Sequence, residues 1–229
     1  MTNPVPLSQE VATRTKAAHD RAESRPFMSQ LLGGSLSVRD YVRYLTALAP
    51  VYDELERQLR AGNDEASISL FDHRRLDRHE RISADLSGFG QDTHRSIGSR
   101  TTNDYVDAIR SAAASPQRLI AHHYTRYLGD LAGGQVIARC MSQHYDIPES
   151  LLTFYDFTDL GDVVHYRRRY KSLLDLVPWT VGERQEFIDE VSKVFDLNAA
   201  LFDELTTEKT GPNSDPGAFL RAERIHLPR

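Results

Sequence analysis

The chain has 229 residues, enough for one domain whose core folds without a disulfide or a structural metal. Its formal net charge of −5 argues against a nucleic-acid-binding protein. No apolar run approaches the roughly 18 residues of a membrane span, and Met1 to Glu10 shows no secretory signal. With a single cysteine, Cys140, the chain is therefore expected to be a soluble cytoplasmic protein without a membrane anchor.

Apolar residues recur with a helical period almost throughout the chain, and strand signals are nearly absent. This pattern predicts an all-α, compact single domain over residues 1–205. A first helix is expected from Ser8 to the residue before Pro26. A second is expected after Ser37, with a kink where Pro50 removes a backbone donor. A linker is expected at about 62–69. A highly charged helix should follow at about 72–86, and a further helix at about 102–115.

Glycines are concentrated inside the longest helical pattern. Pro116 fits the first turn of a helix over about 117–144, and the Gly129–Gly134 stretch is expected to interrupt it. Three glycines, Gly129, Gly133 and Gly134, each cost a helix interior roughly 1 kcal/mol relative to alanine. Some other interaction must offset that cost.

Three explanations for the glycines remain open at this point. The helix breaks in an ordinary turn, small residues allow a close helix–helix contact, or a flat ligand lies against bare backbone. Asp130 favours the ligand, because an acid at such a site can organise water or a proton path. The same residue is equally able to cap a broken helix.

Two further helices complete the domain. A basic helix is predicted at about 162–174. The last long helix begins with a capping box, in which Thr180 pairs with Glu183. The polar segment 206–229 is expected to be a mobile tail.

His19 and Glu23 lie four residues apart in the first predicted helix, and hence on one face of it. A histidine that binds a metal usually donates its second ring nitrogen to a carboxylate. The small residues Ala18 and Ala22 would leave room beside it for a planar group. The alternative is a surface pair that stabilises the helix by a few tenths of a kcal/mol.

Taken together, these segments resemble the haem oxygenase family over most of the chain, from about Ser8 to Leu205. The most specific element is the stretch Tyr124–Gln135, YTRYLGDLAGGQ, which matches the signature of the family's distal helix. Two further matches are the His19 segment, which continues through Phe27 and Met28, and the late pattern of Phe195, Asn198 and Phe202. The resemblance implies a haem held between a proximal helix and a kinked, glycine-rich distal helix.

The resemblance also implies roles for single residues. His19 would be the proximal ligand of the haem iron, with Glu23 as the partner of its ring. Asp130 would hold the waters that deliver protons to the bound dioxygen. The remaining matches concern the backbone of the distal helix. Gly129 and Gly133 would lie against the porphyrin, and Gly134 would let the kink flex.

Cations at the pocket mouth would bind the haem propionates. By the family pattern these are Arg167 and Lys171, with Tyr124 as a hydroxyl donor. A solvated basic face is the alternative, and it must hold for at least Arg168 or Arg169. Many family members also carry a lysine seven residues before the proximal histidine, where this chain has Ala12.

The implied activity is the oxidative opening of haem at a meso carbon to biliverdin, with release of ferrous iron and carbon monoxide. It needs O2 and electrons from a ferredoxin- or flavin-reductase-type donor, and a monomer is expected. A role in iron acquisition, in signalling or in pigment synthesis remains open.

Three other functions are less consistent with these residues. A haem carrier would not need Asp130, and a purely structural helical module leaves the glycines unexplained. A di-iron bundle needs two Glu-x-x-His motifs, and only Glu223 with His226 fits one.

Overall fold

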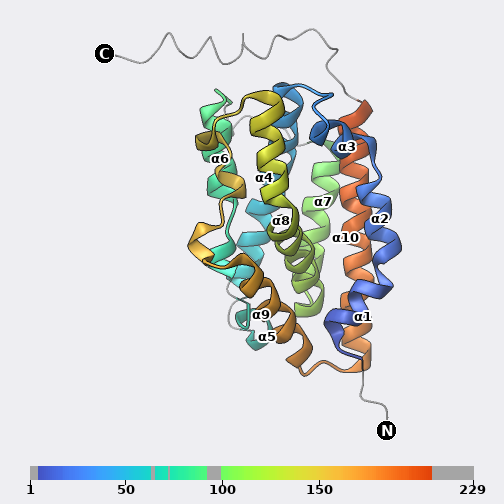
Figure 1. The fold of residues 1–229 in the computed structure, drawn as a ribbon. Coiled ribbons are helices and arrows are strands. Elements are labelled where there is room, and N and C mark those ends of the chain that lie inside the picture. The colour runs from blue at the N-terminus through green and yellow to red at the C-terminus, as the bar shows by residue number, and fades with distance from the viewer. Residues whose placement is uncertain (1–4, 63–64, 72, 92–98, 208–229) are drawn as a thin grey trace.

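The computed structural model describes residues 5–62, 65–71, 73–91 and 99–207, and within these ranges it contains helices and no strand. The all-α fold is therefore confirmed (Figure 1). No helix among these residues is long and apolar enough to cross a membrane. The predicted tail beyond Thr207 lies outside the described residues.

The first predicted helix is divided, so the expectation of one helix before Pro26 was wrong. Helix α1 (Leu7–Arg14) ends and α2 (Lys16–Glu23) begins at Thr15, whose backbone angles are φ −97° and ψ 0°. The Thr15 hydroxyl donates to the carbonyl of Val11 at 2.8 Å, a local bond that competes with regular helical pairing. A third short helix, α3 (Pro26–Leu32), follows.

Helix α4 (Val38–Ala61) begins at a capping box formed by Ser37 and Asp40, and Pro50 lies inside it. The expected linker contains a short helix, α5 (Ala66–Ser69). The prediction of one charged helix over about 72–86 was wrong. The structure has a 3-10 turn, η1 (His73–Leu76), and then α6 (His79–Gly88).

Buried Glu56 explains this division of the charged segment. Its carboxylate accepts the backbone N–H of Arg78 and, at 2.9 Å, that of His79. The chain enters α6 at these two residues, so the helix begins where a side chain from α4 accepts its first free N–H groups.

Helix α7 (Arg100–Ala112) starts two residues before the expected Thr102, because the Ser99 hydroxyl caps it by accepting the Thr102 N–H. Helix α8 (Pro116–Tyr145) has Pro116 at its first turn, as predicted. It is continuous through the glycines, so the predicted interruption was wrong.

Three short 3-10 turns, η3, η4 and η5 (149–151, 153–155 and 158–160), connect α8 to α9 (Val163–Leu176). The basic helix α9 is capped by Asp162. The last helix, α10 (Val181–Thr207), begins with the predicted capping box of Thr180 and Glu183.

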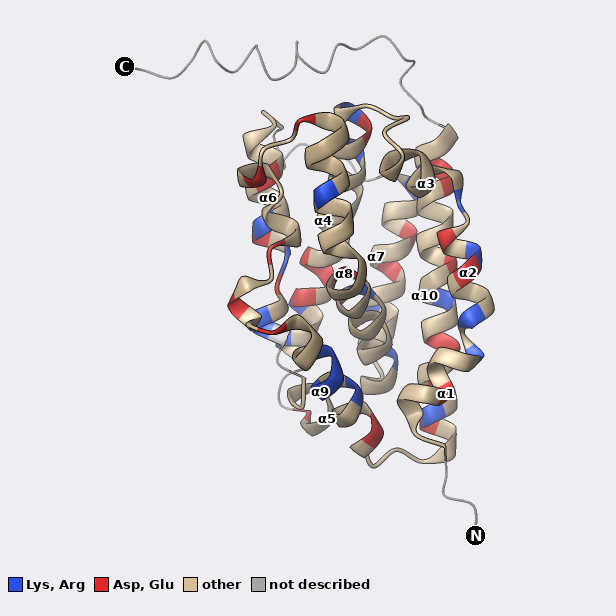
Figure 2. Ribbon diagram, in the orientation of Figure 1, with Lys and Arg blue, Asp and Glu red and all other residues tan. Residues whose placement is uncertain are grey.

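Helix α10 organises the half of the fold that carries the predicted ligand-binding residues. Both α8 and α2 pack against it, while α4 packs against α6 and α7 (Figure 1). Basic residues are concentrated on α9, α2 carries both acidic and basic residues, and the charged residues of α10 are mostly acidic (Figure 2). The His19 segment and the glycine-rich segment, which are far apart in the sequence, are thus placed around one shared helix.

Candidate active site

His19 projects from α2 with its side chain 45% exposed. Its Nε2 lies 3.3 Å from a carboxylate oxygen of Glu23, and its Nδ1 lies 3.7 Å from Asp20. The imidazole meets the ring of Phe195 on α10 edge-on, with centroids 5.1 Å apart. The predicted contact between His19 and Glu23 is thus present, and an aromatic contact restrains the ring as well.

Ala18 and Ala22 do not leave the room expected beside His19. Both are 4% exposed and belong to the buried side of α2. Their small size therefore serves the close packing of this helix rather than access for a planar group.

The three glycines of α8 have two different surroundings. A Cβ added at Gly129 or at Gly133 would meet no atom within 4 Å outside the local helix backbone. A Cβ at Gly134 would come within 3.1 Å of the ring of Tyr155. Two of the explanations left open by the sequence therefore apply. Gly134 allows a close packing contact, and Gly129 and Gly133 border open space.

Asp130 lies in a hydrogen-bonded network that joins three helices. The hydroxyl of Tyr52 on α4 donates to its carboxylate. Arg126 donates to the same hydroxyl through Nε at 3.1 Å and Nη2 at 3.0 Å, and its Nη2 lies 3.7 Å from Asp130. Through Nη1, Arg126 also donates to the side-chain oxygen of Asn198 on α10 at 2.8 Å. The carboxylate is thereby held at one position beside Gly129.

Burial governs the protonation of this network. It raises the pKa of Asp130 above that of an ordinary aspartate, although the Arg126 charge and the Tyr52 hydrogen bond oppose the shift. Burial also raises the pKa of Tyr52 well above its usual value, so this hydroxyl keeps its proton. Asp130 is therefore a carboxyl group that takes up and releases a proton closer to neutral pH than an exposed aspartate does.

The sequence identified Asp130 but gave no role to Tyr52 or Arg126. The spacing of Arg126 and Asp130, four residues apart on one helix, was an available signal. Tyr52 had none beyond its place on an apolar face, because its partner lies 78 residues away.

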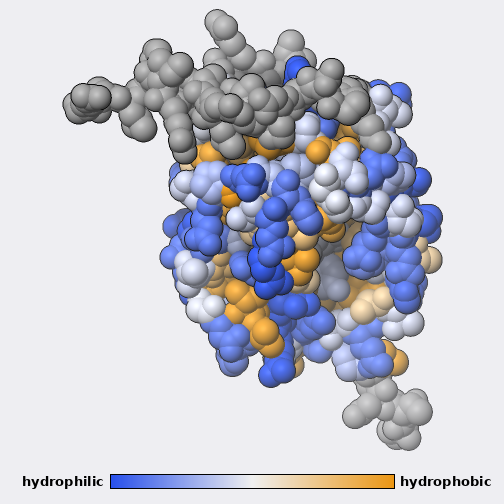
Figure 3. Space-filling model, turned by 45° about the horizontal axis from the view of Figure 1, so that its top comes forward, coloured by the Kyte–Doolittle hydropathy of each residue, from blue (hydrophilic) through white to orange (hydrophobic). Residues whose placement is uncertain are grey.

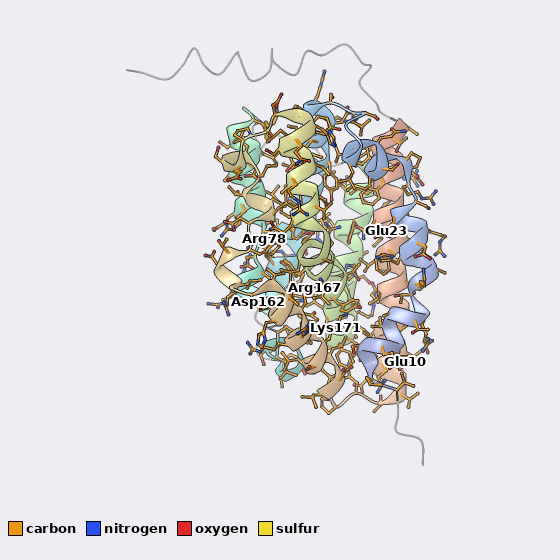
Figure 4. All side chains as sticks on the ribbon, in the orientation of Figure 1. Glu10, Glu23, Arg78, Asp162, Arg167 and Lys171 are labelled. Carbon is orange, nitrogen blue, oxygen red and sulfur yellow. The ribbon has the colours of Figure 1, made fainter. Side chains whose placement is uncertain are left out.

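Helix α9 brings a second group of predicted residues together. The Nε of Arg167 is buried and has no hydrogen-bond partner in the part of the chain that the structure describes. Burial raises the pKa of Tyr124, and the nearby Arg167 charge opposes that shift. Lys171 is exposed one turn further along α9, and Figure 4 shows Arg167 and Lys171 on the side of α9 that faces α1 and α2. Arg168 and Arg169 are exposed, as expected of a solvated face.

The surface is hollowed between these groups. Figure 3 shows a recess near the centre of the molecule, between the side formed by α8 and α9 and the side formed by α2, with apolar residues at its border and hydrophilic residues around it. A recess with an apolar border and hydrophilic surroundings suits a ligand that has both apolar and charged parts.

Comparison with known proteins identifies the same family for most of the chain. A family model described as "Heme oxygenase" matches residues 5–204. A heme oxygenase from Pyropia yezoensis is 32% identical over 205 residues, which is 88% of this chain and 86% of that protein. Another from Guillardia theta is 30% identical over 203 residues, or 87% of this chain and 86% of its own length.

Solved structures agree. The heme oxygenase of Leptospira interrogans superposes with a TM-score of 0.83 at 30% identity, covering 87% of this chain and all (100%) of that one. Heme oxygenase-1 of the cyanobacterium Synechocystis sp. PCC6803, in complex with heme, gives 0.83 at 28% identity, covering 96% of this chain and 97% of that one.

Proposed function

The chain belongs to the haem oxygenase family, and from this premise we propose that its haem lies between His19 of α2 and the Gly129–Gly133 segment of α8. The enzyme is an oxidoreductase that opens haem at a meso carbon to biliverdin and releases ferrous iron and carbon monoxide, using O2 and external electrons. The observation that carries the proposed site is the open space at Gly129 and Gly133, directly beside Asp130, whose side chain is 10% exposed.

The residues present fit a haem. Bare backbone at the two open glycines accepts a flat ring without a Cβ in the way. The half-exposed imidazole of His19 offers a nitrogen to iron, and Glu23 is in place to fix its tautomer. The Nε of Arg167, which is buried and has no partner among the residues that the structure describes, offers a donor for a propionate. His19 therefore matches the iron, the two glycines match the flat ring, and Arg167 matches the charged propionate edge.

When bound, haem supplies the iron that binds dioxygen and the porphyrin ring that is opened. His19 holds the substrate from the proximal side and orients it. Asp130 would hold ordered water beside the open glycines and pass protons through it, while Tyr52 and Arg126 keep its carboxylate in place. Gly129 and Gly133 place no side chain in the space beside them, which leaves room there for the haem and a bound diatomic molecule.

We further propose a ferredoxin- or flavin-reductase-type electron donor, a monomeric enzyme and a cytoplasmic location. The single cysteine, Cys140, supports a reducing compartment, since it has no partner within the chain for a disulfide.

The test of the proposed function is product formation. The purified protein with haem, oxygen and a reductant should yield biliverdin and carbon monoxide in proportion to haem, with catalase present to remove free peroxide. A haem carrier of the same fold would bind haem but would form neither product above a free-haem control.

A leucine at Gly129 or Gly133 is expected to block the distal space. The variant helix should be more stable by about 1 kcal/mol, because leucine has the higher helix propensity. Haem or dioxygen binding should nevertheless be lost, because the side chain would fill the open space beside the glycine. Haem titration, carbon monoxide binding to the ferrous form and thermal melting check this. A variant that is both more stable and fully active would show that the glycine serves packing.

Replacing Arg167 and Lys171 together with alanine is expected to weaken haem binding and to broaden the mixture of biliverdin isomers. Each charge-assisted hydrogen bond is worth about 1.5–3 kcal/mol, so the affinity should fall at least tenfold. Ala12 offers no cation at the lysine position of many relatives, so α9 carries more of the orientation here.

Haem titration and chromatography of the isomers measure both effects. Replacing the exposed Arg168 and Arg169 with alanine is the matched control, since it removes the same charge from the other side of α9. Unchanged affinity and an unchanged single isomer in the first pair would mean that the propionates are held elsewhere.

A further inference from the structure

We propose that His123 is a positioning residue, which sets the orientation of the basic helix α9 through Tyr170 and so places Arg167 and Lys171 at the haem edge. The inference rests on the proposed propionate role of those two cations and deepens it. No part of His123 needs to touch the haem.

The contact between His123 and Tyr170 is short and buried. The Nδ1 of His123 lies 2.8 Å from the hydroxyl of Tyr170. Their rings are nearly parallel, with an interplanar angle of 11° and centroids 5.5 Å apart. His123 is 1% exposed and Tyr170 2% exposed, so no solvent competes for this hydrogen bond. Burial holds the pKa of Tyr170 well above its usual value, so the hydroxyl stays protonated.

The position of His123 on α8 is itself well determined. Its ring packs on that of Tyr127, one turn further along the same helix, with centroids 4.6 Å apart. Phe71 closes the cluster from the other side, 4.6 Å from Tyr170 and 5.9 Å from His123. His123 and Tyr127 of α8 thus pack with Phe71 into an aromatic cluster, and the Nδ1 of His123 contacts α9 at the Tyr170 hydroxyl.

Tyr170 connects this cluster to the cations. Arg167 precedes it by three residues and Lys171 follows it directly, so any rotation of α9 moves all three together. Arg167 has an unpaired Nε among the described residues, and Lys171 is exposed, so neither side chain anchors the helix by itself. Tyr170 is thus the anchored residue of α9 that lies between them in the sequence, and His123 supplies its specific contact.

Charge-assisted hydrogen bonds to a carboxylate depend on geometry. A small rotation of α9 would weaken both cation contacts without removing either charge. The effect of changing His123 should therefore appear only with a ligand that carries free propionates. A general loss of structure would weaken the binding of any porphyrin.

The experiment compares two ligands, ferric haem and its dimethyl ester, in which both propionates are capped. For His123→Leu and Tyr170→Phe, haem affinity should fall about 5-fold, which corresponds to one hydrogen bond of about 1 kcal/mol. Affinity for the dimethyl ester should stay within about twofold of the parent. The proportion of a second biliverdin isomer should rise in the same variants.

Three further variants complete the design. His123→Asn keeps a polar atom near the Nδ1 position and should recover most of the affinity for haem. Ser172→Ala removes an exposed hydroxyl of the same helix, which donates to the Arg168 carbonyl, and should bind both ligands as the parent does. The double variant of His123→Leu and Tyr170→Phe should lose no more affinity than either single change, because both remove one shared bond.

The inference is overturned if His123→Leu and Tyr170→Phe bind haem like the parent, or if both lose affinity for haem and the dimethyl ester equally. Tyr170→Phe keeps the ring, and its thermal melt verifies that it folds. The double change of Arg167 and Lys171 to alanine distinguishes failure of the proposed propionate site from failure of the positioning role of His123. If that variant binds haem normally, the proposed propionate site fails as well. If it binds weakly while the His123 variants do not, only the positioning role fails.

Discussion

Replacing Asp130 with alanine is expected to leave haem bound through His19 and to abolish nearly all biliverdin formation. Positioned proton transfer contributes roughly 100-fold to 10,000-fold to a rate, so product per haem should fall by at least about 100-fold. Carbon monoxide and biliverdin are measured per haem, with catalase present, beside the absorption spectrum of the bound haem. An alanine at exposed Asp107 on α7 is the control for the loss of a carboxylate.

A second variant, Asp130→Asn, excludes misfolding as the cause. Because burial raises the pKa of Asp130, the stability from this group is full at low pH and is lost as the pH rises through the raised pKa. An amide still accepts from Tyr52 and carries no charge to be buried, so this variant should not lower the melting temperature at a pH above the raised pKa of Asp130. Biliverdin formation at the parent rate in both variants would refute the proton-delivery role while leaving the enzyme assignment intact.

Replacing His19 with alanine is expected to remove the axial nitrogen from the haem iron. The resonance Raman band of the ferrous iron–histidine bond should disappear, and activity should fall to a small fraction of the parent value. Added imidazole should restore part of both, because it can occupy the space that the ring leaves. A wild-type Raman band in the variant would show that another residue is the ligand.

Two controls accompany the His19 variant. His165→Ala removes an exposed histidine from α9 and should change neither the Raman band nor the activity. Glu23→Gln keeps a hydrogen-bonding group near the His19 ring but removes the charge. It should shift the iron–histidine band to lower frequency without abolishing it, because a neutral partner makes the imidazole less basic.

Much of the site could be predicted because its signals act within one or two helical turns. His19 and Glu23 are one turn apart on α2, and their contact follows from helical spacing alone. The predicted capping box of Thr180 and Glu183 and the helix start at Pro116 likewise depend on residues at most three apart. The helical period of the apolar residues was sufficient for the fold class, because burial of one face repeats every turn.

The first predicted helix divides at Thr15 because of a local bond to Val11, but in two other places a distant contact outweighed the local preference. The helix runs through Gly129–Gly134 despite the propensity cost, since both flanks of α8 are packed and Gly134 gains contact with Tyr155. The charged segment after residue 72 divides where Glu56, from α4, captures the backbone of Arg78.

By itself the sequence determined the all-α class and the extent of several long helices, such as α8 and α9, because these depend on neighbours along the chain. His19, Asp130 and the glycines were singled out as candidate site residues by the resemblance of their motifs to a known family. The tertiary structure alone decided which side chains complete the site. Tyr52 and Asn198 reach Arg126 across 74 and 72 residues, and His123 reaches Tyr170 across 47. Such contacts form only when separate helices are packed against one another, and no spacing within a helix encodes them.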